Sequence, residues 1–325
     1  MGPEIIAKSL TSKPIYDRCN PFVVGDARII RDIVKLLGLP LKTNAFSGLA
    51  DAVFEHGTID VFDLKNFNEK LVFGKVSAAA GQAAFESIEK VIELAMNKEI
   101  DATVTAPINK EAIHLAGKNF SGHTEIYAHY TGTKKYAMLL VHENLRVIHV
   151  TTHVSLRQAC DLVKKDRILE VTKLLYDACL NFGIPNPRIG VAGLNPHSSD
   201  NGLFGWEEEK EIIPAIEVAL EKGINVEGPI PADTMFAKAI GGQYDGCVAM
   251  YHDQGHIPFK LTGFKWNETK KRMDVNGVNI TLGLPIIRVS VDHGTAFDVA
   301  GKGIASEEAM SLSIDYAIRM AENRK

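Results

Sequence analysis

The sequence is poor in cysteine and has no long apolar run. Its four cysteines, Cys19, Cys160, Cys179 and Cys247, are scattered over 325 residues without the spacing of a disulfide framework. No stretch approaches about 18 uninterrupted apolar residues, which argues against a membrane-spanning helix. The opening residues MGPEIIAKSL also lack the basic start and apolar core of a secretory signal. These absences favour a reduced, cytoplasmic protein.

Charge of one sign is not in excess either. The chain has 36 basic and 40 acidic residues, a formal net charge of −4, and no prominent Lys/Arg block. A surface for nucleic acid or for an anionic membrane is therefore not expected. The composition, 46% hydrophobic and 23% charged, is that of a globular protein and excludes disorder.

The common phosphate-binding motifs are missing. The sequence contains no G-x-x-x-x-G-K-[ST] and no G-x-G-x-x-G after a strand. A P-loop NTPase and a standard Rossmann dinucleotide site are therefore excluded.

What is present is an alternation of short apolar runs with amphipathic stretches, which indicates an α/β fold. The strongest helical periodicity covers residues 76–98, and 136–153 look like two strands joined in an antiparallel hairpin. Further predicted strands cover 21–27, 59–64, 101–108, 188–195, 246–251 and 278–292. No repeat or linker separates two halves, so we expect a second domain that is interleaved with the first.

Three histidines follow directly on predicted strands: His153, His197 and His252. Ligands bind at the carboxyl ends of strands in open α/β sheets. Three neutral imidazoles meeting there would form a divalent-metal site with a position open for substrate. Each histidine could equally be a hydrogen-bonded structural residue, and spacing alone does not decide.

A second group of residues is suited to anions. Gly122-His123-Thr124 precedes a predicted helix, whose N-terminus favours a phosphate. Alternatively, Thr124 is only a helix cap and His123 a surface residue. Lys260, Asn279 and Arg288 lie in strand-rich segments, where a buried cation needs an anion or an internal salt bridge.

A third candidate is the polar run from Ser290 to Asp298, which interrupts a strand before the chain resumes as a helix. Such a loop could be a plain turn or could contact the ribose and adenine of a nucleotide. The residues alone favour the turn.

Five blocks carry a resemblance to a known family: GHTEIYA, TAPINKEA, GLNPHSSDNGLFG, YHDQGHIPFK and GVNITLGLPIIRVSVDHGTAFDVAG. They resemble, in register, the 4-hydroxythreonine-4-phosphate dehydrogenase family, and the match runs from Gly2 to the last helix. The resemblance implies an isocitrate/isopropylmalate dehydrogenase-like α/β/α fold with a mixed sheet. That fold binds nicotinamide dinucleotides without a Rossmann fingerprint.

The resemblance also implies roles for individual residues. The divalent-metal ligands would be His153, His197 and His252, in a site completed across a homodimer interface. The substrate contacts would be His123, Thr124, Lys260, Asn279 and Arg288. The dinucleotide-binding turn would contain Asp292, His293, Gly294, Thr295 and Asp298.

The implied activity is oxidation and decarboxylation of a 4-phosphorylated 3-hydroxy acid, with NAD or NADP and a divalent metal such as Zn, Mg, Mn or Co. His256 and Phe259 favour the branch that uses D-threonate or D-erythronate 4-phosphate in carbohydrate metabolism. The alternative is 4-phosphohydroxy-L-threonine in pyridoxine biosynthesis, and a second alternative is a metal-dependent lyase or hydrolase without dinucleotide. Lys110 and Asp253 are candidates for proton transfer or for support of a metal ligand.

The resemblance further predicts one dehydrogenase unit over residues 1–325 with two interleaved subdomains. Residues 1–120 and 270–325 would form the cofactor side, and 121–269 the metal and dimerisation side. The segment 266–275 is an insertion relative to the family, polar and charged, and is expected to be a surface loop. We also expect that the family's opening strand and most of its G-D-P-x-G-I-G-P-E loop are absent, so that a longer form would be more stable and more active.

Overall fold

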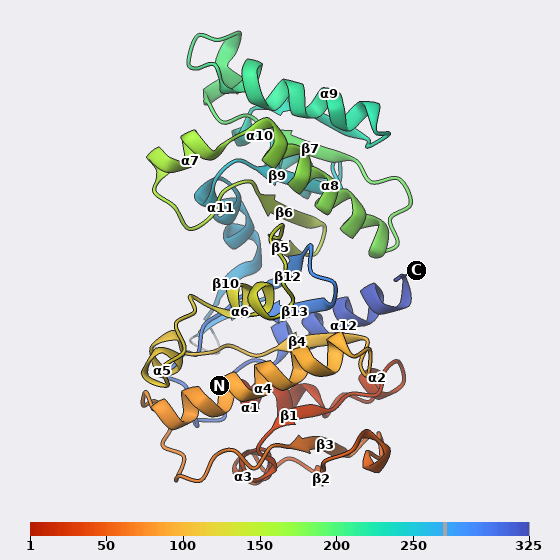
Figure 1. Ribbon diagram of the computed structural model, residues 1–325, viewed down its shortest axis with the longest axis vertical. Coiled ribbons are helices and arrows are strands. Elements are labelled where there is room, and N and C mark those ends of the chain that lie inside the picture. The colour runs from red at the N-terminus through yellow and green to blue at the C-terminus, as the bar shows by residue number, and fades with distance from the viewer. Residues whose placement is uncertain (269–271, 325) are drawn as a thin grey trace. The chain divides into compact units, whose positions relative to one another are not determined.

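The computed structural model describes residues 1–268 and 272–324, and the chain separates into two compact units. Unit 1 contains residues 1–134 and 284–321, and unit 2 contains residues 135–283 with the end of the chain. Both combine helices with β-structure, which confirms the predicted α/β class (Figure 1). The assignment of cofactor and metal to different subdomains stays a prediction.

Unit 1 is built on parallel strands. Strands β1, β3 and β2 form one parallel sheet in that order, and β4 pairs in parallel with β13. The strands are β1 (Val23–Gly25), β2 (Lys42–Phe46), β3 (Thr58–Asp63), β4 (Ala102–Thr105) and β13 (Ile287–Val291). The α-helices are α1 (Gly2–Ser9), α2 (Lys13–Tyr16), α3 (Ala27–Leu36), α4 (Ala78–Met96), α5 (Lys110–Leu115), α6 (His123–Tyr130) and α12 (Glu308–Glu322), and η1 (Leu49–Asp51) is a short 3₁₀ turn.

Amphipathic helices close the core of unit 1. Helix α3 repeats buried residues at helical spacing, with Ile30, Ile33 and Val34 packed in one cluster with Ile59 and Val61 of β3. Elsewhere in the unit, the long helix α4 packs directly on α5. A methyl group on Gly81 of α4 would lie 2.1 Å from the carbonyl oxygen of Ala112, so this close approach requires glycine.

Unit 2 contains a mixed sheet in the order β12-β5-β6-β9-β7-β8. Its strands are β5 (Ala137–His142), β6 (Leu145–His149), β7 (Ile189–Ala192), β8 (Val226–Ile230), β9 (Gly246–Ala249), β10 (Phe264–Asn267), β11 (Arg272–Val275) and β12 (Val278–Leu282). Its helices are α7 (Leu156–Leu162), α8 (Lys165–Asn181), α9 (Ile213–Glu221), α10 (Ala232–Ile240) and α11 (His252–Gly263), with a 3₁₀ turn η2 (Pro196–Asp200) and a π-helical turn η3 (Glu208–Ile212).

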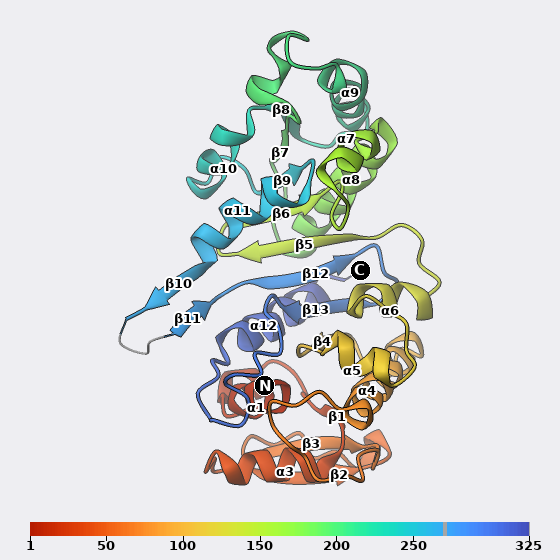
Figure 2. The same ribbon diagram turned by 90° about the vertical axis from the view of Figure 1, so that its left-hand side faces the viewer.

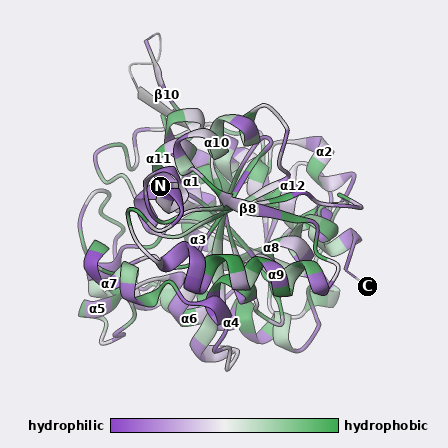
Figure 3. Cartoon of the chain, turned by 90° about the horizontal axis from the view of Figure 1, so that it is seen from above, coloured by the Kyte–Doolittle hydropathy of each residue, from purple (hydrophilic) through white to green (hydrophobic). Residues whose placement is uncertain are grey.

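The pairing in this sheet confirms the predicted hairpin. Strands β5 and β6 are antiparallel and joined tightly, and β12 is antiparallel to β5. Strand β6 then pairs in parallel with β9, β9 with β7, and β7 with β8. Successive side chains of a strand point to opposite faces of the sheet, so both faces need a cover. Helix α8 covers one face, and α10 and α11 cover the other (Figure 2). Hydrophilic and hydrophobic segments alternate along the helices (Figure 3).

One expectation is wrong, and one helix was not predicted. The segment 266–275 is not a loop, because β10 and β11 pair as an antiparallel hairpin that extends α11 (Figure 2); residues 269–271 lie outside the described residues. Helix α11 was not expected, because Gly255 and Pro258 interrupt its helical pattern. Among the helices of the described residues, none has the length and apolar character that a membrane span requires.

Candidate active site

The three strand-end histidines lie on neighbouring strands of unit 2. His153 follows β6, His252 follows β9 and His197 follows β7, and these strands are adjacent and parallel in the order β6-β9-β7. The carboxyl ends of adjacent parallel strands meet at one edge of the sheet. The fold therefore brings the three histidine-bearing loops to the same edge.

His252 is the best oriented of the three. It is the first residue of α11, and its Nδ1 lies 2.6 Å from Oδ1 of Asp253. A carboxylate on one imidazole nitrogen fixes the ring and leaves the other nitrogen available to a metal. The ring also stacks on that of His256, with centroids 3.7 Å apart and planes at 11°. Asp253 is thus placed to orient His252, one of the roles that the sequence suggested for it.

The other two histidines differ in environment. The rings of His153 and His252 have centroids 6.0 Å apart. His197 is 68% exposed and has a left-handed backbone with φ 52°. The next four residues, 198–201, also have positive φ, at a cost of roughly 1–2 kcal/mol for each non-glycine residue. Such strain persists only where the surroundings hold it, and it is typical of functional sites.

The donor set fits a divalent metal in its chemistry, because three loops that each carry an imidazole leave the same sheet edge. Their side chains are not gathered around a common point, however. Within residues 1–268 and 272–324, no group of three or more His, Cys, Asp or Glu side chains is close enough to hold an ion. The histidine triad therefore stays a prediction.

Two buried histidines lie beneath this edge and were not predicted as site residues. His149, at the end of β6, is 1% exposed, and its ring centroid is 4.7 Å from that of His256. Burial and the neighbouring His256 and His252 lower the pKa of His149 to about 3. Burial and His252 lower the pKa of His256 to about 4. Gly255 makes room for this pair, because a methyl group there would lie 2.4 Å from Nε2 of His149.

A buried cation marks a candidate anion site in unit 1. Arg288 on β13 is 3% exposed and donates from Nη2 to Oγ1 of Thr105, at the end of β4, over 3.0 Å. Its guanidinium lies 5.6 Å from the centroid of the Tyr127 ring. Burial lowers the pKa of Arg288 to about 10, so the group stays charged at neutral pH. The sequence analysis did not predict Thr105 or Tyr127 as site residues. Its one signal for this region was the predicted strand 101–108, which contains Thr105 and ends near Pro107.

His123 belongs to the same group of residues. It begins helix α6, and burial together with the charge of Arg288 lowers its pKa well below 6.5. The alternative that Thr124 caps this helix is wrong, because the N-cap is Gly122 and Thr124 lies inside the first turn. The side chain of Lys110 passes nearby, since a methyl group on Gly122 would lie 3.8 Å from its Cε.

Two further substrate candidates lie in unit 2. The expectation that Lys260 is a buried cation in a strand-rich segment is wrong, because it is an exposed residue near the end of helix α11, with Nζ 5.5 Å from the centroid of the Phe264 ring. Asn279 is half-buried on β12, opposite Leu140 of β5. Their contact with a substrate stays a prediction.

The predicted dinucleotide turn follows β13 in unit 1. His293 faces its own loop, with Nδ1 3.0 Å from the carbonyl oxygen of Gly294, and burial lowers its pKa. Ala296 has φ 39°, and the amide of Val299 donates to its carbonyl over 3.1 Å. Asp292, Thr295 and Asp298 belong to the same irregular segment. The geometry is that of a polar turn, and nucleotide binding there stays a prediction.

An open cavity of about 560 Å³ borders His153 in unit 2. It is lined by the segment 150–154 and by Leu162, Lys164, Asp166 and Arg167. Lys164 and Arg167 already pair with Glu211 and Glu170. The cavity is therefore next to the histidine edge, but its cations are partly neutralised.

Comparison with known proteins gives a family match over most of the chain. Residues 17–317 match the family model described as pyridoxal phosphate biosynthetic protein PdxA. The chain is 47% identical over 325 residues to a D-threonate 4-phosphate dehydrogenase from Cupriavidus necator, covering 100% of this chain and 95% of the relative.

Solved structures with high similarity carry a related name. A 4-hydroxythreonine-4-phosphate dehydrogenase from Klebsiella pneumoniae is 45% identical with a TM-score of 0.86, covering 98% of this chain and 94% of that chain. An enzyme of the same name from Burkholderia phymatum is 43% identical with a TM-score of 0.83 and the same coverage.

Proposed function

Because this chain belongs to the family of the pyridoxal phosphate biosynthetic protein PdxA, we propose that it is a nicotinamide-dependent and divalent-metal-dependent dehydrogenase. Its substrate is D-threonate 4-phosphate or D-erythronate 4-phosphate. The C3 hydride is transferred to NAD and the C3 hydroxyl loses its proton, giving a 3-keto acid. Loss of carbon dioxide and protonation of the enolate then yield dihydroxyacetone phosphate.

One structural observation supports this proposal independently of the names of the relatives. Three loops with a histidine each emerge from the adjacent parallel strands β6, β9 and β7 at one sheet edge. In the proposed enzyme, His153, His197 and His252 hold the divalent ion, and Asp253 fixes the ring of His252 through its Nδ1. A divalent ion held by these residues would supply Lewis acidity for the oxidation and the decarboxylation.

Arg288 and His123 bind an anionic group of the substrate. A guanidinium that remains charged in a buried position favours a phosphate or carboxylate, to which it can donate two parallel hydrogen bonds. His123 stays neutral beside it, so it can donate a further hydrogen bond without adding charge. Thr124, Lys260 and Asn279 complete the substrate contacts.

A nicotinamide is required because no side chain accepts a hydride. The turn from Asp292 to Asp298 is proposed to contact the dinucleotide, since its carboxylates and backbone groups suit ribose hydroxyls. Lys110, beside Gly122, is proposed for proton transfer.

A second copy of the chain is the proposed partner, in a cytoplasmic homodimer that completes the metal site. Helix α11 supports this proposal: Ile257 and Leu261, one turn apart, are 58% and 76% exposed. The exposed pair lies on the helix that begins with His252.

The second candidate substrate is 4-phosphohydroxy-L-threonine. It is favoured by the description of the matching family model and by the solved structures named 4-hydroxythreonine-4-phosphate dehydrogenase. It carries an ammonium at C2 where the sugar acids carry a hydroxyl, so the site must either pair or reject a positive charge.

Replacing His252 tests the metal site. We expect His252→Ala to lose bound metal and turnover while far-UV circular dichroism stays that of wild type. The matched control is His129→Ala, which removes an exposed histidine of α6. Metal content measured on the purified proteins checks this, and wild-type stoichiometry in His252→Ala would contradict the assignment.

A further inference from the structure

The loop that carries His197 needs support from outside itself. Residues 197–201 are five consecutive non-glycine residues in the left-handed region, a conformation that is unfavourable for each of them. The loop also folds back tightly on the end of β7, because a methyl group on Gly193 would lie 2.7 Å from Oγ of Ser198. Some other part of unit 2 must hold this conformation in place.

A buried carboxylate from the π-helical turn η3 supplies that support. Oε1 of Glu208 accepts hydrogen bonds from the amides of Leu194 and Asn195 at 2.8 and 2.7 Å. Its Oε2 accepts from Nδ2 of Asn195 at 2.8 Å. Three donors from the two residues that follow Gly193 thus converge on one side chain, directly before Pro196 and His197.

Glu208 is an unusual residue to find at this position. Its side chain is 1% exposed, and no lysine, arginine or histidine of the described residues forms an ion pair with it. A buried carboxylate is costly unless its oxygens are fully hydrogen-bonded. The turn that presents it is π-helical, a local irregularity that often occurs at functional sites. Helix stability alone does not require an acidic side chain here.

A second link joins this loop to the helix that bears His252. Gln254 of α11 is buried, and its Nε2 donates to the carbonyl oxygen of Gly193 over 2.7 Å. Its Oε1 accepts from the amide of Met250, at the end of β9, over 2.6 Å. One amide side chain therefore connects the end of β7 with the end of β9.

We propose that Glu208 is a positioning residue for metal binding, which holds the start of the His197 loop through Leu194 and Asn195, next to the Gly193 carbonyl that Gln254 of the His252 helix binds. This inference rests on the proposed metal site. Glu208 does not contact the ion; it acts through the backbone that precedes His197. Gln254 binds Gly193, the residue directly before Leu194 and Asn195.

The test is metal affinity, measured by titrating metal-free protein with Co²⁺ and following the visible absorption of the bound ion. Glu208→Gln keeps the shape of the side chain but replaces one acceptor oxygen by a donor that faces other donors. We expect a 10- to 100-fold weaker Co²⁺ affinity, as is typical when a group supporting a metal ligand is removed. Glu217→Gln, the same change at an exposed position of α9, is the matched control and should bind as wild type does.

Asn195→Ala is the milder variant. It removes the hydrogen bonds from Nδ2 to Glu207 and Glu208 and leaves both amide bonds to Glu208, so a smaller loss of affinity is expected. This variant decides the question if Glu208→Gln does not fold.

Wild-type affinity in both variants, with binding abolished in His252→Ala, would overturn this inference and leave the metal site standing. Binding that is unaffected by His252→Ala would overturn the metal site and this inference together. A lower melting temperature in Glu208→Gln without a change in Co²⁺ affinity would also overturn it, because the role would then be structural.

Discussion

A guanidinium with 3% of its surface exposed is a costly residue for any fold to retain. Arg288 gains a hydrogen bond to Thr105 and the face of Tyr127, yet its pKa still falls to about 10 on burial. A charged guanidinium at this position suits a bound anion, which is the role proposed for it.

Substituting Arg288 should therefore weaken substrate binding more than it slows the chemical step. We expect Arg288→Ala to raise KM with a smaller change in kcat, at a cost of about 1.5–3 kcal/mol in kcat/KM. Lys260→Ala should act in the same direction. Steady-state kinetics checks this, with the exposed Lys238→Ala on α10 as control. A wild-type KM in both variants would mean that the two cations are structural.

The depressed pKa of His123 makes stability depend on pH. Burial and Arg288 keep the folded group neutral, while the unfolded group takes a proton near pH 6.5. The unfolded state therefore binds more protons below that pH. The contribution of His123 to stability is complete above pH 6.5 and falls as the pH is lowered, by about 1.4 kcal/mol per pH unit at most.

Replacing His123 with a residue that does not titrate should flatten this dependence. Between pH 8 and pH 5, the loss in free energy of unfolding should be smaller in His123→Gln than in wild type by up to about 2 kcal/mol. Urea denaturation at the two pH values measures it. His149 and His256 keep contributing to the slope in both proteins. An identical slope would show that folding does not lower the pKa of His123.

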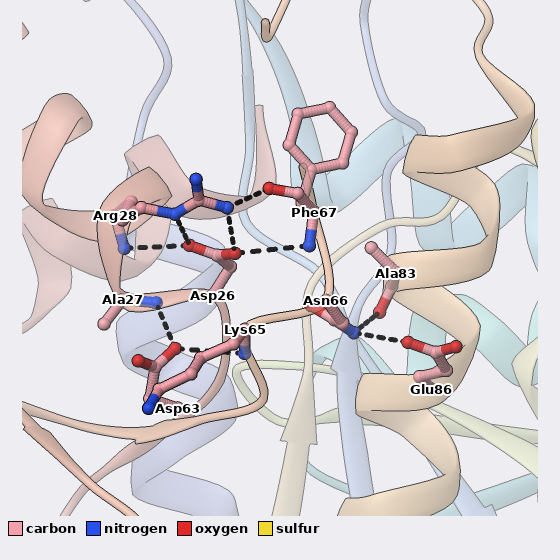
Figure 4. Close-up of polar contacts among 9 residues, drawn as sticks. All are labelled: Asp26, Ala27, Arg28, Asp63, Lys65, Asn66, Phe67, Ala83 and Glu86. Carbon is pink, nitrogen blue, oxygen red and sulfur yellow. Dashed lines mark hydrogen bonds and ion pairs between the residues drawn. The ribbon is translucent and has the colours of Figure 1, made fainter. Parts of the chain in front are cut away.

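At the level of elements, the start of helix α3 shows how a carboxylate organises a strand-to-helix turn. Asp26 is the N-cap of α3 and accepts the amide of Arg28 at 2.9 Å, while its other oxygen accepts the amide of Phe67 at 3.2 Å (Figure 4). The Arg28 guanidinium pairs with the same carboxylate and bonds the carbonyl of Phe67. One side chain thus joins the helix start to the segment after β3.

Removing this cap should destabilise unit 1 without touching the candidate site residues. We expect Asp26→Ala to lower the free energy of unfolding by about 1–3 kcal/mol, since it loses the cap and leaves the amide of Phe67 without its acceptor. Asp17→Ala, which breaks an exposed pair with Lys13, should cost under about 0.5 kcal/mol. Chemical denaturation of the two variants measures the difference, and equal stabilities would contradict it.

The elements that the sequence predicted are those with an uninterrupted pattern. Helix α4 lies within the predicted 76–98, and the β5–β6 hairpin within 136–153. Helix α11 was missed because Pro258 lacks an amide hydrogen and Gly255 is a poor helix former, so tertiary packing overrides the local pattern. The hairpin β10–β11 was taken for a loop because a polar, charged segment gives no core-facing alternation.

The candidate site, like the fold, could be predicted only in part from the sequence. Position after a strand predicted His153, His197 and His252 as candidate metal ligands, because that signal lies in the local sequence. The supporting groups were not predictable, because their roles depend on contacts between distant segments. His149 meets His256 across about a hundred residues, and Gln254 of helix α11 reaches Gly193 at the end of β7.

For the molecule as a whole, the question is which phosphorylated acid it oxidises. The chain is similar over its full length to a D-threonate 4-phosphate dehydrogenase, and His256 lies directly under the candidate metal ligand His252. The similarity to that relative favours the sugar-acid phosphates, whose C2 group is a hydroxyl.

The most direct test is the reduction of NAD by the purified chain, followed by nicotinamide absorbance, with each of the three candidate substrates. We predict a higher kcat/KM for D-threonate or D-erythronate 4-phosphate than for 4-phosphohydroxy-L-threonine, dihydroxyacetone phosphate as product, and loss of the signal with a metal chelator. A higher kcat/KM for 4-phosphohydroxy-L-threonine would instead indicate a role in pyridoxine biosynthesis. If neither NAD nor NADP is reduced with any of the three substrates in the presence of divalent metal, the proposed dehydrogenase activity is contradicted.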